Sequence, residues 1–150
     1  MTDWLLKSEP QTYSIHDLER DGTTVWDGVR NYQARNFLRQ MQPGDRVFFY
    51  HSNITTPAIV GLARVIRSNF ADPTQFDPNS AYFDPKATPE APRWNAVEVE
   101  FVKIFSQPLS LSRLKAQFEA TELLLVRPGN RLSVMPVAEK VAREILKNSE

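Results

Sequence analysis

The feature that most constrains the fold is the stretch from Val25 to Met41, where an apolar strand end leads directly into an amphipathic helix. Within it, Asp27-Gly28 is a pair typical of a tight turn. Asn31 is a favourable N-cap, and the apolar residues that follow it recur at helical spacing: Ala34, Phe37, Leu38 and Met41. The stretch therefore predicts a strand, a turn and a helix that packs one face against a core.

The start of this predicted helix is basic. Arg30 precedes the N-cap and Arg35 follows one turn later. Because the first backbone N–H groups of a helix are unpaired and carry partial positive charge, this position suits a phosphate. Trp26, just upstream, offers a flat surface on which an unpaired base can stack. The pattern favours nucleotide binding, although a Trp packed in the core and solvated Arg side chains would produce the same sequence.

The length predicts one domain spanning residues 1–150. The formal net charge is zero, so the overall charge does not indicate a nucleic-acid partner. The charge is nevertheless segregated along the chain. Residues 28–67 carry six Arg against the single acidic residue Asp45, whereas acidic residues prevail in residues 69–100. Two arrangements fit this pattern: one basic face, or neighbouring strands that neutralise each other.

Composition excludes several classes of protein. The chain has no cysteine, which rules out disulfides, thiolate nucleophiles and zinc sites with sulfur ligands. The N-terminus lacks the pattern of a signal peptide, and no apolar stretch approaches the ~20 residues that span a bilayer. We therefore expect a cytosolic protein with no membrane partner.

The remaining periodicity predicts an α+β fold, with a curved or barrel-like mixed sheet and helices packed outside it. Gly61 inside a predicted strand, and a slip of the apolar phase at Val102, both indicate bulges that bend the sheet. Ser14 and Ser110 are expected to cap helices, and Pro136 to open the last one. The expected strands are 4–6, 23–26, 46–51, 57–67, 94–105 and 131–134, and residues 122–126 fit either a helix or a strand.

A long segment rich in Pro and Asp, residues 72–92, lies between two predicted strands. A connection of this length in a compact domain is either mobile or functional. Phe76, Tyr82 and Phe83 favour a segment that packs onto the rest of the protein.

Catalytic patterns are sparse. His16 and His51 fall in different elements, and the adjacent pair His51 and Ser52 lacks a third group to orient it. The sequence contains neither a glycine-rich phosphate loop nor a cluster of metal ligands, so we expect no cofactor and no metal. Polar residues instead gather at predicted strand ends and turns, where a curved sheet can bring them together: Lys7, Ser8, Asn31, Tyr32, Ser52, Asn53, Arg131 and Ser133. Trp26 and Trp94 are the aromatic residues expected to wall a flat ligand between them.

Several long motifs in this chain resemble the EVE-domain family: Trp4-Leu-Leu-Lys-Ser-Glu-Pro10, Trp26-Asp-Gly-Val-Arg-Asn-Tyr-Gln-Ala-Arg-Asn-Phe-Leu38, Phe49-Tyr-His-Ser-Asn53, Asp72-Pro-Thr-Gln-Phe-Asp-Pro78, Tyr82-Phe-Asp-Pro-Lys86, Pro92-Arg-Trp94 and Asn130-Arg-Leu-Ser-Val134. The resemblance runs from about residue 3 to residue 146. It implies a PUA-like pseudo-barrel related to the YTH readers of methylated adenine. It also implies binding of a modified base, of the 5-methylcytosine type in DNA or a modified base in RNA.

By the same resemblance, individual residues acquire expected roles. Lys7 and Ser8 would line the floor of the pocket, with Trp26 and Trp94 as its walls. Asn31 and Ser52 would read the edge of the base, and Arg131 would contact a phosphate.

Three functions remain open at this stage. The first is a non-catalytic reader that flips a modified base between Trp26 and Trp94 and holds the flanking phosphates with Arg30, Arg35 and Arg131. The second is an enzyme acting on a modified base or nucleotide, with Glu9 or His51 as general base. The third is a scaffold that binds a small molecule or a protein.

Overall fold

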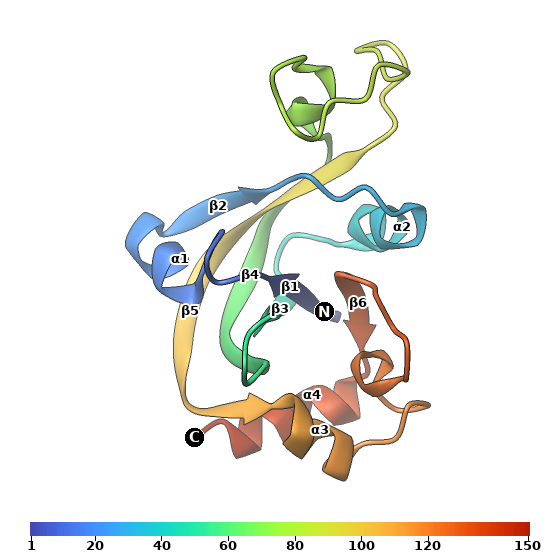
Figure 1. Cartoon of the computed structure of the whole chain (residues 1–150). Helices are drawn as coiled ribbons and strands as arrows, with labels where there is room; N and C mark the ends of the chain where they lie inside the picture. The colour runs from blue at the N-terminus through green and yellow to red at the C-terminus, as the bar shows by residue number, and fades with distance from the viewer.

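The computed structural model describes residues 1–150 and contains one curved, open, mixed sheet of six strands with helices around it (Figure 1). The strands lie in the order β2-β5-β4-β3-β1-β6, and only β1 and β3 are parallel. The strands are β1 (Asp3–Ser8), β2 (Thr23–Trp26), β3 (Arg46–His51), β4 (Ala58–Ala71), β5 (Asn95–Ser110) and β6 (Val134–Val137). The helices are α1 (Ile15–Asp21), α2 (Tyr32–Gln40), α3 (Leu111–Gln117) and α4 (Glu139–Asn148), with 3₁₀ turns at Pro73–Phe76 and Leu124–Val126. The predicted α+β class, with helices outside a curved sheet, is confirmed.

The bulges that bend the sheet lie where the sequence indicated them. Phe49 pairs with Gly61 and Tyr50 with Ile59, which leaves the residue between Ile59 and Gly61 unpaired. A Cβ atom at Gly61 would lie 2.7 Å from the backbone oxygen of Lys103, so no larger residue fits there. The register between β4 and β5 also shifts across Val102. Because each bulge adds twist, the two longest strands curve around the core and do not form a flat sheet.

The helices pack as their caps and apolar faces predict. Ser14 accepts a hydrogen bond from the backbone N–H of Asp17, and Asp17 accepts one from that of Ser14, which completes a capping box before α1. Asn31 caps α2 by accepting the N–H of Ala34. Ala34 and Leu38 are fully buried against the sheet. None of the helices is both long and apolar enough to span a bilayer.

The C-terminal prediction was wrong in one respect. Pro136 does not open the last helix; it lies in β6 opposite Trp4, and α4 begins at Glu139. β6 pairs only with β1 and is therefore an edge strand, which tolerates a residue without an N–H. The strand therefore begins at Val134, where the predicted one ended.

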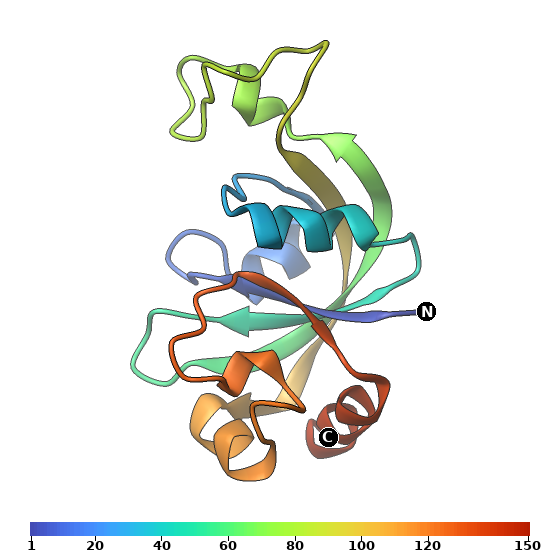
Figure 2. The same cartoon turned by 90° about the vertical axis from the view of Figure 1, so that its right-hand side faces the viewer.

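The segment that follows β4 extends beyond the end of the sheet in both views (Figures 1 and 2). Its anchor is polar. The fully buried Gln75 donates from its side chain to the backbone oxygens of Asp72 and Trp94 and accepts from the N–H groups of Arg93 and Trp94. The hydrogen bonds of this buried side-chain amide therefore hold the two ends of the segment together. Of the aromatic residues expected to pack it down, Tyr82 and Phe83 are exposed.

Candidate functional site

A cavity of about 620 Å³ opens beside the ends of β1 and β2. This volume falls within the roughly 300–1,000 Å³ of sites that hold small flat ligands. Half of the predicted binding and phosphate-contact residues line it, namely Lys7, Ser8, Trp26, Arg30, Asn31 and Ser133. Nine residues that were not predicted as binding residues also line it, among them Glu9, Asp27 and Tyr82. A smaller hollow of about 180 Å³ near Thr55 and the start of α3 contains no aromatic residue.

Trp26 forms one wall of the cavity. It is the last residue of β2 and pairs with Val97 of β5, so its backbone is fixed by the sheet. Its ring meets the buried Phe49 edge to face, with 5.5 Å between centroids. The indole is half-buried, since the core supports it on one side and the cavity exposes it on the other. This is the arrangement required of a stacking platform.

Tyr82 is the second aromatic residue of the cavity, and it comes from the long segment after β4. A Cβ atom at Gly28 would lie 2.8 Å from the Tyr82 ring, so only a glycine lets the ring approach. Gly28 also has φ of 77°, a conformation that side chains rarely adopt. Gly28 therefore has two roles in the cavity: its backbone conformation turns the chain after Trp26, and its lack of a side chain lets the Tyr82 ring pack there.

Arg30 holds this segment in place. Its guanidinium donates to the Tyr82 backbone oxygen at 2.6 Å and 3.0 Å, to the Asp72 carboxylate at 3.0 Å and to the Thr74 hydroxyl at 3.0 Å. Another hydrogen bond goes to the Val29 oxygen. With these donors engaged, a phosphate could bind Arg30 only by displacing Asp72 or the segment. The structure therefore favours a positioning role over the predicted phosphate contact.

Asp72 completes the same anchor and is fully buried. It accepts the Gly28 N–H at 2.8 Å, as well as hydrogen bonds from Arg30 and Thr74. Burial alone would raise the pKa of Asp72, but the hydrogen bonds from Thr74, Gly28 and Arg30 outweigh it and lower the pKa. The carboxylate is consequently charged and ties the turn after β2 to the segment after β4.

Trp94 does not line the cavity, which corrects the prediction of a sandwich between two indoles. Its side chain is buried, its N–H donates to Asp84 at 2.8 Å, and Tyr32 stacks on its face with 4.9 Å between centroids. The guanidinium of Arg30 lies 5.2 Å from the Trp94 ring and 5.6 Å from the Tyr82 ring. Trp94 thus supports the segment and Arg30 from outside the cavity.

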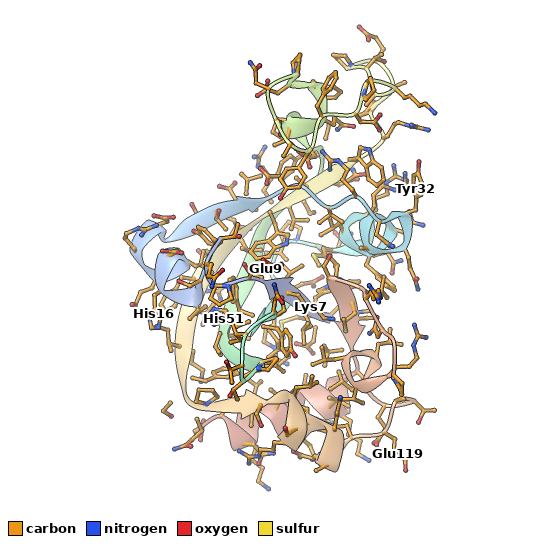
Figure 3. All side chains as sticks on the ribbon, viewed as in Figure 1. Lys7, Glu9, His16, Tyr32, His51 and Glu119 are labelled. Atoms are coloured by element: carbon orange, nitrogen blue, oxygen red, sulfur yellow. The ribbon has the colours of Figure 1, made fainter.

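Tyr32 and Arg35 belong to this outer cluster and not to the cavity lining. The Arg35 guanidinium lies 4.7 Å from the Tyr32 ring and donates to the Arg93 oxygen at 3.0 Å. Figure 3 shows Tyr32 at the start of α2, well apart from Lys7 and Glu9 at the end of β1. Both residues remain accessible to solvent beside the segment, with Tyr32 51% exposed.

The polar residues of the cavity come from both the N-terminal and the C-terminal parts of the chain. The Lys7 backbone N–H donates to the oxygen of Ser133, which brings the segment before β6 beside the end of β1. Burial lowers the pKa of Lys7, and no carboxylate forms an ion pair with its ammonium group. The Ser8 hydroxyl donates to the Tyr13 oxygen. Asn31 uses its side-chain oxygen as a cap, which leaves its NH₂ group free to donate to a ligand.

The other predicted residues lie outside the cavity lining. Ser52 is tied to β1 through its backbone N–H, which donates to the Ser8 oxygen at 2.9 Å. Asn53 is exposed, with φ of 57°, in the turn after β3. Arg131 is exposed two residues before Ser133 and makes no ion pair, so it remains available at the side of the cavity.

His51 is also outside the cavity lining. Its Nε2 accepts the backbone N–H of Ile15 at 3.0 Å, so the lone pair that a general base needs is engaged. Burial, followed by the nearby His16, lowers the pKa of His51 and keeps the ring neutral. Figure 3 places His51 at the end of β3, next to α1. The ring fastens α1 to the sheet.

The basic segment (residues 28–67) and the acidic segment (residues 69–100) pair with each other across neighbouring strands, which was one of the two arrangements predicted from the sequence. Arg64 pairs with Glu100 at 2.8 Å and Arg67 with Glu98 at 3.2 Å, across β4 and β5. Arg30 pairs with Asp72 in the same sense. Most of the basic residues of this part of the chain therefore do not form a free phosphate-binding face. No cluster of three or more His, Asp or Glu side chains is placed to hold a metal.

Comparison with known proteins adds the family. The model of the family described as "EVE domain" matches residues 2–148. The chain belongs to the EVE domain family. This EVE domain is 51% identical to a Pseudomonas putida protein of known crystal structure, with a TM-score of 0.94 over 99% of each chain.

Human relatives are similar over nearly the whole domain. Thymocyte nuclear protein 1 of Homo sapiens is 38% identical over 155 residues, which cover 91% of this EVE domain and 69% of the human protein. A crystal structure of human THYN1 protein in complex with 5-methylcytosine containing DNA superimposes with a TM-score of 0.93 at 36% identity, covering 100% of this chain and 98% of that one.

A more distant likeness concerns the fold alone. The YTH domain of Zygosaccharomyces rouxii MRB1 protein, in complex with N6-methyladenosine RNA, superimposes with a TM-score of 0.56 at 13% identity. The predicted likeness of this EVE domain to a YTH domain is confirmed at the level of the fold.

Proposed function

We propose that this EVE domain is a non-catalytic reader of a modified base, and that it takes the base out of a nucleic acid into the cavity between Trp26 and Tyr82. The observation that carries the proposal is the cavity itself. It has an aromatic wall at Trp26, a second aromatic residue at Tyr82 and polar groups at Lys7 and Asn31. A flat guest that stacks while its edge meets hydrogen-bonding groups is the chemistry of a flipped base.

The human relative supports the choice of ligand. That protein binds DNA containing 5-methylcytosine, and the likeness extends over the whole of this chain. We therefore propose 5-methylcytosine in DNA as the preferred ligand. Cytosolic location remains a prediction from the sequence.

Non-catalytic binding is favoured because neither residue expected to act as general base in the enzyme alternative, His51 or Glu9, is well placed for that role. His51 is engaged with a backbone N–H, as described above. Glu9 does line the cavity but is exposed at its end. Reading requires only stacking and a matched edge, and both are available.

The test is a titration of short DNA duplexes and RNA strands that carry one modified or unmodified cytosine at the same position. We expect tighter binding of the methylated DNA, with affinity that falls as salt rises because phosphate contacts release counterions. Tighter binding of modified RNA would assign the domain to RNA. Equal binding of all probes, salt-independent binding, or turnover of the modified base would contradict the proposal.

A further inference from the structure

Asp27 is the one aspartate of the chain whose carboxyl accepts no hydrogen bond from another residue and forms no ion pair. The other seven are all engaged: Asp3, Asp17, Asp21, Asp45, Asp72, Asp77 and Asp84. Asp27 nevertheless lines the cavity, immediately after the stacking wall at Trp26. A carboxyl that lines a cavity beside an aromatic wall, and that no other residue of the protein engages, is available to take hydrogen bonds from a ligand.

The surroundings of Asp27 favour its protonated form. Asp27 is exposed at the edge of the cavity, but the partial burial of its carboxyl raises its pKa and the buried Asp72 carboxylate raises it further, whereas a hydrogen bond from its own backbone N–H lowers it. Arg30 also lowers the pKa, but its guanidinium is bound to Asp72 and to Tyr82. The other charged or titratable groups that line the cavity are Lys7, Glu9, Tyr13 and Tyr82.

A protonated carboxyl offers a donor and an acceptor side by side. Cytosine and adenine present the complementary pair, because a ring nitrogen that accepts lies next to an amino group that donates. Uracil and thymine have a ring N–H at that position, and guanine has a ring N–H beside its amino group. On the Watson–Crick edge, a neutral carboxyl therefore distinguishes the first two bases from the other three.

We infer that Asp27 reads this edge of the flipped base: its O–H donates to the ring nitrogen, and its second oxygen accepts a hydrogen from the exocyclic amino group. The inference rests on the proposed function and adds the chemical class of base that the cavity selects. One proton is shared between the carboxyl and the ring nitrogen. Above the pKa of Asp27 in the free protein this proton is taken up from solvent on binding, so the complex holds one proton more than the separate partners.

The sign of the pH effect follows from this balance. Below the pKa of Asp27 in the free protein the proton is already present, and affinity does not depend on it. Above that pKa each complex must take up a proton, so affinity falls as pH rises, by up to about tenfold per pH unit. A carboxylate that accepted only the amino hydrogen would give no such fall.

Asp27→Asn is the informative variant, because an amide has the donor and acceptor of a protonated carboxyl at every pH. Glu9→Gln is the matched control: it neutralises the other carboxylate in the cavity lining and leaves Asp27 unchanged. Each variant and the wild type are titrated with a short duplex carrying one 5-methylcytosine, and with a duplex carrying thymine at that position, between about pH 5.5 and pH 8. Calorimetry in buffers of different ionisation enthalpy counts the protons taken up.

We expect wild type and Glu9→Gln to take up a number of protons that approaches one toward the highest pH of the series, and to lose affinity for the methylated duplex as pH rises. Asp27→Asn should bind it with pH-independent affinity, with no proton uptake, and at least as tightly as wild type at the highest pH. Asp27→Ala should lose about tenfold in affinity at low pH and prefer 5-methylcytosine over thymine less.

Two results in the variants would overturn the inference alone: binding by Asp27→Asn with the same proton uptake as wild type, or wild-type affinity and preference in Asp27→Ala. Failure of the wild type to bind either duplex at any pH would overturn the proposed function, and the inference with it. Methylated-duplex binding by the wild type that depends on Trp26 but not on pH would leave the proposed function standing and contradict the role of Asp27.

Discussion

Trp26 and Trp94 look alike in the sequence, and the structure separates them. Trp26 rests on Phe49 by one side and lines the cavity with the rest of its ring. Trp94 has its face covered by Tyr32, its N–H bound to Asp84, and no part in the cavity lining. An aromatic residue is therefore available to a ligand only where the protein has left a face of it without a partner.

The same contrast applies to arginines. Arg30 lines the cavity and is fully engaged in holding the segment after β4, whereas the exposed Arg131 makes no ion pair. A positive charge near a site therefore has two separable uses, which are to build the site and to hold the ligand. Substitutions at each kind of residue test this division between residues that build the site and residues that contact the ligand.

The largest effect is expected from Asp72→Ala. This change leaves the Arg30 guanidinium and the Gly28 N–H without their buried acceptor, so we expect a loss of about 3 kcal/mol in the free energy of unfolding. Affinity for methylated DNA should fall as well, because Tyr82 is no longer held. Chemical denaturation and a binding titration measure the two effects.

Glu98→Ala is the matched control, because it breaks the exposed pair with Arg67, in which the side chains are 56% and 27% exposed. A surface pair of this kind should contribute less than about 1 kcal/mol. Equal losses from Asp72→Ala and Glu98→Ala would show that the anchor at Arg30 has no special role.

The next effect concerns the second wall of the cavity. Tyr82→Ala removes a ring that lines the cavity, and we expect about a tenfold loss of affinity for the methylated duplex, since a base stacked on an aromatic side chain gains ~1–3 kcal/mol. Phe83→Ala, at the next position, removes a ring that is 39% exposed and outside the cavity lining. Its affinity should match that of the wild type. If both variants bind equally, Tyr82 is not a wall.

The smallest effect is expected at the phosphates. Arg131→Gln should weaken binding two- to threefold at moderate salt and lower the slope of log affinity against log salt by about one, with little change in preference for the modified base. Arg64→Gln removes a charge already paired with Glu100, so its slope should stay close to that of the wild type. A wild-type slope in Arg131→Gln would exclude a phosphate contact there.

Local features of the fold could be predicted from the sequence because neighbouring residues determine them. Asn31 and Ser14 predict the starts of two helices, and Gly61 and Val102 predict bulges. The structure contains all four features. Pro136 misled because its tolerance in β6 depends on the strand lying at the edge of the sheet, which no local pattern reports.

The site was only half predictable for the same reason. Lys7, Trp26 and Asn31 lie at ends of elements that the sequence marks, and the curved sheet brings them together. Tyr82 was missed, because its position depends on contacts with Gly28 and Arg30 across more than fifty residues of sequence. The one available signal was the length of the segment after β4, which pointed to a functional role without naming the residue.

The most direct test of the central claim, that a modified base stacks on Trp26 inside the cavity, is the affinity of Trp26→Ala for a duplex carrying one 5-methylcytosine. We predict a loss of roughly 10- to 100-fold relative to wild type, together with loss of preference over unmodified DNA. Trp94→Phe, which keeps a ring beneath Tyr32, should bind within about twofold of wild type. A folded Trp26→Ala that binds the methylated duplex as tightly and as selectively as the wild type would contradict the account.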